Sequence, residues 1–246
     1  MRWLARIAAI VAVLLVALVW IVPAILTQGP MPAALPALDP SATVDVDVGS
    51  HVTFTPADGN GTGMIIYPGG FVDPRSYAPA ARALAEAGSL VVIVEMPLGL
   101  AVLGPNRADS VIADHPDVDL WVIAGHSLGG TMAARYASDH PDAVHGLVLW
   151  ASYPENGVDL TDWTGETASV FGTRDGLTTL DDIEQSRAHL PTDTAFVSIE
   201  GGNHAQFGWY GDQRGDHPAT IPRPEQQRAI VDATSAVLFD LIAAGD

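Results

Sequence analysis

One serine lies in the stretch Gly-His-Ser-Leu-Gly at residues 125–129, where two contrasting patterns meet. The apolar run over residues 120–124 is typical of a strand that is covered on both faces. The alanine-rich run over residues 130–137 is typical of a helix. A strand that turns at once into a helix over small residues exposes the side chain between them. The stretch therefore predicts a nucleophile elbow with Ser127 at its tip, and a glycine-rich turn with a surface serine is the alternative.

Strand and helix patterns alternate along most of the chain. Such alternation indicates right-handed crossovers and an α/β fold, with a mostly parallel sheet flanked by helices and an antiparallel edge. Residues 43–48 and 51–55 show period-2 alternation and predict a hairpin. Further strands are expected at residues 63–67, 90–96, 120–124, 146–150, 168–172 and 195–199, and helices at residues 77–88, 107–115, 130–137, 179–189 and 223–243.

A serine hydroxyl becomes a useful nucleophile only when a base takes its proton and a carboxylate orients that base. After an elbow of this type the acid and then the histidine follow in loops after later strands. His204 follows the predicted strand at residues 195–199, so we select it as the base. His189 at a helix end and His217 in a turn are the other histidines that this order allows. The order excludes His51, His115, His126, His140 and His145.

The same reasoning selects the acid. Asp175 comes directly after the predicted strand at residues 168–172, where its carboxylate would point at the imidazole. Glu95 ends an otherwise apolar strand near the same edge of the sheet, so it is an alternative acid or a supporting group. The remaining acidic residues of this region precede the strand or lie in the helix that follows it: Asp159, Asp162, Asp181 and Asp182.

Two backbone amides are expected to bind the oxyanion of an acyl-transfer reaction. One is the amide of Leu128, directly after the nucleophile. The other should come from the loop at residues 67–72, because its paired glycines let the backbone turn its amides toward a substrate. We assign this second donor to Phe71, with Gly70 as the close alternative.

The N-terminal residues have the pattern of a segment that targets a protein to a membrane. Residues 7–26 form a run of 20 residues without a charge, long enough to span a hydrocarbon core of about 30 Å. Arg2 and Arg6 precede the run and no basic residue follows until Arg75, which places the N-terminus in the cytoplasm. We therefore expect an N-terminal transmembrane helix and a domain on the extracytoplasmic side. Cleavage as a signal peptide near residues 22–24, giving a secreted protein, is the alternative.

These features divide the chain into three parts. Residues 1–27 are the expected membrane anchor and residues 43–246 the expected catalytic domain. Residues 28–42 contain several prolines and predict a semi-rigid, extended linker.

Composition excludes several classes of partner. The chain has no cysteine and 11 basic residues, and its formal net charge is −18. A chain this acidic is unsuited to nucleic acid, which needs basic patches. Thiolate metal sites are excluded by the lack of cysteine, and we expect neither a metal nor a cofactor.

Together, the elbow, the paired glycines at residues 69–70 and the stretches at residues 172–176 and 201–204 resemble the α/β-hydrolase superfamily. Residues 96–107 and 204–208 are similar to one subgroup, the family-5 α/β-hydrolases related to dienelactone hydrolases. The resemblance covers about residues 43–243. It implies an α/β-hydrolase fold and a serine-dependent hydrolase without a cofactor. Dienelactone hydrolases typically use a cysteine nucleophile. Because this chain has Ser127 instead, the resemblance gives weaker support for that particular activity.

Three functions compete on this basis. The first is a membrane-anchored, carboxylesterase-like serine hydrolase that cleaves small ester substrates through an acyl-Ser127 intermediate. The second is an acyltransferase or thioesterase that uses the same triad. The third is a non-catalytic binding protein on a hydrolase fold, which the complete set of Ser127, Asp175 and His204 disfavours. The oligomeric state is left open.

Overall fold

The computed structural model describes residue 3 and residues 25–245 of the chain. Most of the predicted membrane helix, up to residue 24, lies outside this part. No helix in the described part has both the length and the apolar character needed to cross a bilayer. The membrane anchor therefore stays a prediction from the sequence.

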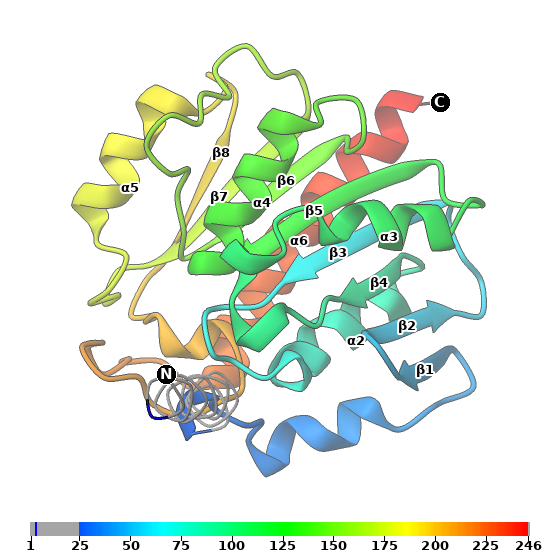
Figure 1. Cartoon of the computed structure of the whole chain (residues 1–246), viewed down its shortest axis with the longest axis horizontal. Coiled ribbons are helices and arrows are strands. Elements are labelled where there is room, and N and C mark those ends of the chain that lie inside the picture. Colours follow the sequence, from blue (N-terminus) through cyan, green and yellow to red (C-terminus); the bar gives the residue numbers. More distant parts are fainter. Residues whose placement is uncertain (1–2, 4–24, 246) are drawn as a thin grey trace.

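An eight-stranded sheet forms the centre of the domain, in the order β1-β2-β4-β3-β5-β6-β7-β8 (Figure 1). Strand β2 pairs antiparallel with both β1 and β4. Every other neighbouring pair is parallel. This is the predicted α/β fold with its antiparallel edge. The strands are β1 (Val44–Val48), β2 (Val52–Pro56), β3 (Thr62–Tyr67), β4 (Leu90–Ile93), β5 (Leu120–His126), β6 (Gly146–Trp150), β7 (Glu166–Gly172) and β8 (Ala195–Ile199).

Helices cover both faces of the sheet because its central strands are apolar on both faces. On β3, Met64 and Ile66 join one hydrophobic cluster, while Ile65 and Tyr67 join the other. Side chains of α2 and α6 complete the first cluster, and side chains of α3 and α4 complete the second. The helices are α2 (Ala78–Glu86), α3 (Arg107–Asp114), α4 (Leu128–Asp139), α5 (Leu180–Ser186) and α6 (Arg223–Gly245).

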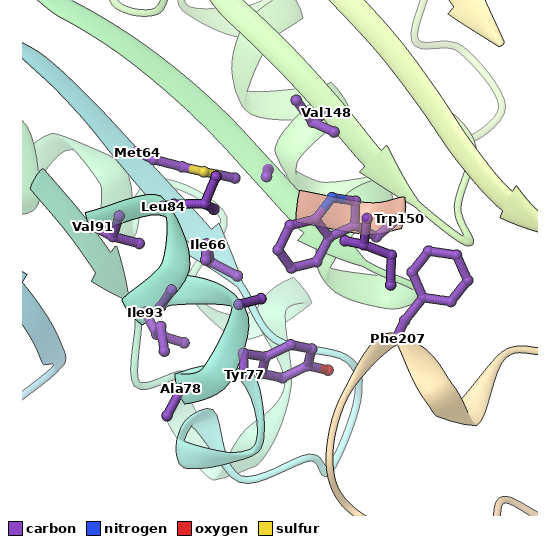
Figure 2. Packing of buried hydrophobic residues seen from close by; sticks show 14 of the residues in the cluster. Met64, Ile66, Tyr77, Ala78, Leu84, Val91, Ile93, Val148, Trp150 and Phe207 are labelled. Carbon is purple, nitrogen blue, oxygen red and sulfur yellow. The ribbon is translucent and has the colours of Figure 1, made fainter. Parts of the chain in front are cut away.

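Aromatic rings fill the first cluster close to the carboxyl ends of the central strands. Figure 2 shows the ring of Trp150 next to those of Tyr77 and Phe207, with Ile66 and Leu84 in the same cluster. The Tyr77 and Trp150 ring centroids are 6.4 Å apart, and all three aromatic side chains are fully buried. This packing holds the segment that follows β8 against the sheet.

The predicted linker at residues 28–42 is not an extended spacer. Pro32–Leu38 form a 3-10 helix, and Ala34 within it is fully buried. Arg82 of α2 donates its guanidinium hydrogens to the carbonyls of Ala37 and Asp39. The prediction failed because prolines also start 3-10 turns, and because the contacts that hold this segment come from residues distant in sequence.

Strand β4 ends earlier than the apolar pattern predicted. It stops at Ile93, so Glu95 lies beyond the strand with an exposed side chain. The helix expected at residues 179–189 is split into α5 and a 3-10 turn at Arg187–His189. The other predicted elements are present with small shifts of their ends.

Candidate active site

Ser127 occupies the predicted tight turn between β5 and α4. Its backbone angles, φ of 52° and ψ of −124°, are values that a residue with a Cβ rarely adopts. Its amide donates to the carbonyl of Trp150 at 3.0 Å, and its carbonyl accepts the Ser152 hydroxyl at 2.7 Å. These bonds to the segment at and after the end of β6 hold the strained residue in place, and its half-buried side chain is open to a ligand.

Three glycines allow the strand and the helix to meet at this turn. A Cβ on Gly130 would lie 2.5 Å from the carbonyl oxygen of Gly125 and from Cβ of Ser152. A Cβ on Gly125 would overlap the backbone of Gly129, and a Cβ on Gly129 would overlap the carbonyls of Tyr67 and Pro68. The turn thus requires glycine for close packing, as the sequence pattern indicated.

Asp175 and His204 are paired in the interior, as the sequence predicted. Oδ2 of Asp175 lies 2.8 Å from Nδ1 of His204, and both side chains are almost completely buried. Oδ1 of the same carboxylate accepts the amides of Leu177 at 2.8 Å and Thr178 at 2.7 Å. The acid is thereby fixed by its own loop. Nε2 of His204 has no hydrogen-bond partner among the described residues, which leaves it to act on a ligand or a hydroxyl.

The loops after β5, β7 and β8 bring the serine and this pair to one edge of the sheet (Figure 1). The His204 ring centroid is 4.6 Å from that of His126, the residue directly before Ser127. Thr178, three residues after Asp175, donates its hydroxyl to the carbonyl of Ala151 after β6. The carboxyl ends of neighbouring parallel strands form this edge, which explains why residues so distant in sequence meet here.

The loop that carries His204 is anchored by residues that the sequence reasoning missed. Gln226 on α6 accepts the amide of Asn203 at 3.0 Å and donates to its carbonyl at 2.7 Å. Asp216 accepts the amides of Ala205 at 2.9 Å and Gly176 at 3.0 Å, so it ties the histidine loop to the acid loop. No local pattern marks these residues, because their partners are backbone amides of other segments.

The two candidates for the second oxyanion donor, Phe71 and Gly70, differ in whether their amides are already bonded. The amide of Phe71 donates to the carbonyl of Gly99 at 2.7 Å, so it is already bonded. The amide of Gly70 has no acceptor among the described residues, and a Cβ on Gly70 would lie 3.4 Å from the side chain of Leu128. Leu128 is the first residue of α4, where an amide has no partner within the helix. Gly70 is therefore the better-placed alternative.

His126 and Tyr77 form a buried link that the sequence did not reveal. The Tyr77 hydroxyl accepts the amide of Gly69 at 2.9 Å and lies 2.9 Å from Nδ1 of His126. Complete burial lowers the pKa of His126 well below its ordinary value of 6.5, and the nearby His204 lowers it further. His126 is therefore held in its neutral form beside His204. Residues 68–73 form the loop that follows β3 and contains Gly69 and Gly70. We name this segment the oxyanion loop.

The other candidates from the sequence do not join this pair through their side chains. His189 and His217 have exposed side chains. Partial desolvation and the charge of Asp73 raise the pKa of the exposed Glu95, and the charges of Arg75 and Arg107 act against this shift. Within the described part, no group of three or more histidine, aspartate or glutamate side chains is arranged to hold a metal ion. The expectation of a reaction without metal or cofactor stays a prediction.

Comparison with known proteins agrees with this geometry. A model of the alpha/beta hydrolase family matches residues 63–228, well over half of the chain. The chain belongs to the alpha/beta hydrolase family. The resemblance drawn from the sequence is confirmed at the level of the superfamily, and so is the expectation of an enzyme of the hydrolase type.

Individual relatives of this family member are more distant. It is 42% identical over 75 residues to the pimeloyl-(acyl-carrier protein) methyl ester esterase of Photorhabdus laumondii, a match that covers 30% of the chain and only 26% of that protein. Among solved structures, it is similar to esterase 2 of Thermogutta terrifontis phosphoramylated by tabun, with a TM-score of 0.57, 14% identity, and coverage of 81% of this chain and 96% of the other. A hydrolase from the metagenome of Mar Chica lagoon sediments gives a TM-score of 0.53 at 20% identity, with coverage of 66% and 89%. These two likenesses show the fold.

Proposed function

We propose that the protein is a serine esterase that cleaves carboxylic esters through an acyl-Ser127 intermediate. The observation that carries the proposal is the buried pair of Asp175 and His204, whose free Nε2 belongs to a ring 4.6 Å from that of His126, next to the strained Ser127. A buried carboxylate that bonds Nδ1 keeps Nε2 available as a base and stabilises the imidazolium that forms. The esterases among the similar proteins support the proposal.

The first half of the reaction forms the acyl-enzyme. His204 takes the hydroxyl proton of Ser127 at Nε2 while Oγ attacks the carbonyl carbon of the ester. The amides of Leu128 and Gly70 donate hydrogen bonds to the carbonyl oxygen and stabilise the negative charge that develops on it. The tetrahedral intermediate then expels the alcohol, which receives the proton from His204.

The second half releases the acid. Water gives a proton to His204 and attacks the acyl carbon, and the collapse of the second intermediate returns that proton to Ser127. His126 is buried beside this histidine and neutral, so it does not oppose the positive charge that His204 carries in each half-reaction. We further propose that residues 7–26 anchor the enzyme in a membrane with its catalytic domain on the extracytoplasmic side.

The proposal is tested with an alkyl fluorophosphonate probe and a panel of 4-nitrophenyl esters of graded chain length. We expect the wild type to be labelled at Ser127 and to hydrolyse these esters, because the probe reacts only with an activated serine. Ser127→Ala should lose the label and lower kcat by roughly 10⁴–10⁶-fold. Ser110→Ala, a change at an exposed serine of α3, is the matched control and should behave as the wild type. An unlabelled wild type, or a Ser127→Ala variant that keeps its activity, would overturn the proposal.

A further inference from the structure

The first described residues after the apolar run are bonded to the active-site loops. The amide of Gln28 donates to the carbonyl of Phe71 at 2.7 Å, and its carbonyl accepts the amide of Asp73 at 3.0 Å. The amide of Met31 donates to the carbonyl of Trp209 at 2.6 Å. Phe71 and Asp73 belong to the oxyanion loop, and Trp209 follows His204 by five residues. The uncharged run at residues 7–26 therefore ends two residues before a segment fixed at the catalytic edge of the sheet.

Figure 1 shows this arrangement in the ribbon. The blue start of the described chain lies beside the orange segment between β8 and α6, at the end of the molecule that holds the loops after the parallel strands. A segment that leaves a bilayer at Leu26 has only Thr27 between it and Gln28. Such a short connection holds the catalytic edge close to the membrane surface.

Exposed apolar side chains gather on the same edge. Val102 and Leu103 follow β4 and are 48% and 52% exposed. They belong to a segment that contacts the oxyanion loop, since Leu100 lies 3.7 Å from the Cβ position of Gly70. We name the following exposed residues the apolar rim; they lie at the first described residues after the apolar run, in the segments after β4, β6 and β7, and at the first residue of α5: Ile25, Leu26, Val102, Leu103, Tyr153, Leu177 and Leu180.

Few other large apolar side chains are exposed in residues 25–245. They are Leu35 in the 3-10 helix beside α2, Val48 at the β1–β2 turn and Phe239 in the last part of α6. They are scattered, whereas the rim surrounds the site from several loops. Exposed apolar side chains that gather around a site mark an interaction surface.

We propose that the apolar rim rests on the surface of a lipid bilayer, so that the active site opens toward the membrane. Lipid is the partner that fits this surface, because the uncharged run at residues 7–26 is of membrane-spanning length and leads directly into the rim. The net charge of −18 points to an uncharged, zwitterionic lipid surface rather than an anionic one. As a consequence, and resting on the proposed function, the substrate is an ester with a long acyl chain that enters from the bilayer.

The orientation is tested without any use of activity. The chain has no cysteine, so a single cysteine is introduced by Val102→Cys or Leu180→Cys, and at control positions by Val48→Cys or Phe239→Cys. Each full-length variant is labelled with a polarity-sensitive fluorophore and reconstituted into phosphatidylcholine vesicles that contain nitroxide-labelled lipid. We expect a blue shift and at least threefold quenching at positions 102 and 180, and neither at positions 48 and 239.

Other results would overturn the orientation. Equal quenching at all four positions, or quenching confined to the controls, would mean that another face meets the lipid. A blue shift at position 102 that appears without vesicles and depends on protein concentration would show a second copy of the chain on the rim. Full-length protein that stays unbound to vesicles with its N-terminus intact would also contradict the proposal.

A second measurement addresses the substrate class. Val102→Ser/Leu103→Ser should hydrolyse soluble 4-nitrophenyl acetate at the wild-type rate, but should cleave a long-chain ester embedded in the same vesicles at least fivefold more slowly. Val48→Ser/Phe239→Ser should match the wild type on both esters. A rim variant that keeps its activity on the embedded ester would overturn the substrate class. A wild type inactive on both esters would instead contradict the proposed function, and the fluorophore result would still decide the orientation.

Discussion

The hydroxyl of Tyr77 lies 2.9 Å from Nδ1 of His126 and, on its other side, accepts the amide of Gly69. One buried oxygen thus joins the oxyanion loop to the residue before the nucleophile. Since both partners are sealed from water, the distance between the oxyanion amides and Ser127 depends on this link.

Tyr77→Phe should therefore damage both stability and rate. The change leaves the Gly69 amide and His126 Nδ1 buried without their partner, which costs about 1–3 kcal/mol of unfolding free energy. It should also lower kcat about tenfold or more with a smaller effect on KM, because the oxyanion amides are displaced. Urea unfolding and steady-state kinetics on a soluble ester measure the two effects. Tyr136→Phe, which removes a hydroxyl bonded to Asp109, is the control and should lose stability without loss of kcat.

The pair of Asp175 and His204 should act as a unit. His204→Ala removes the base, and Asp175→Asn disturbs the imidazole that the carboxylate orients, so each should lower kcat by about 10³-fold or more. The double variant should be scarcely slower than His204→Ala alone, because effects within a triad are not additive. Glu95→Gln is the comparison, since Glu95 was the alternative acid. If Glu95→Gln were inactive and Asp175→Asn active, the acid would be misassigned.

His126 should make the protein less stable in mild acid. Its pKa in the folded protein is lowered from 6.5 by burial, so below pH 6.5 the unfolded chain binds a proton that the folded chain does not. The unfolding free energy should then fall by up to about 1.4 kcal/mol per pH unit as the pH decreases from 6.5 toward the folded-state pKa. Urea titrations at pH 7.5, 6.0 and 5.0 measure this slope. His126→Gln should flatten it, with His189→Gln as an exposed control, and an unchanged slope in His126→Gln would exclude His126 as its origin.

The segment at residues 28–41 should be needed by the domain. A chain of residues 28–246 keeps the bonds of Gln28 and Met31 and the buried Ala34, whereas a chain of residues 42–246 loses them. At about 1 kcal/mol for each of the three lost backbone bonds of Gln28 and Met31, the shorter chain should be less stable by about 3 kcal/mol or more. Its kcat should also fall, because the oxyanion loop loses its support. Thermal unfolding and ester hydrolysis are measured for both chains. Equal stability and equal kcat would indicate that residues 28–41 act only as a spacer.

The sequence was informative where a residue type has a steric or chemical reason of its own. The glycines around Ser127 are required by close packing, and Asp175 and His204 follow strands whose apolar patterns are plain, so these positions could be predicted. Phe71 was preferred over Gly70 because nothing local reveals that its amide is bonded to Gly99. The 3-10 helix at Pro32–Leu38 was read as extended for the same reason, since Arg82 and α2 supply its contacts.

The close packing of the elbow has a genetic consequence. Every single-base change in a glycine codon that alters the amino acid introduces a side chain with at least a Cβ. At Gly125, Gly129 and Gly130 that atom would overlap the backbone of the turn, the carbonyls after β3 or the Ser152 side chain. No point mutation in these three codons that changes the amino acid therefore preserves the packing. This part of the enzyme cannot change gradually through single substitutions.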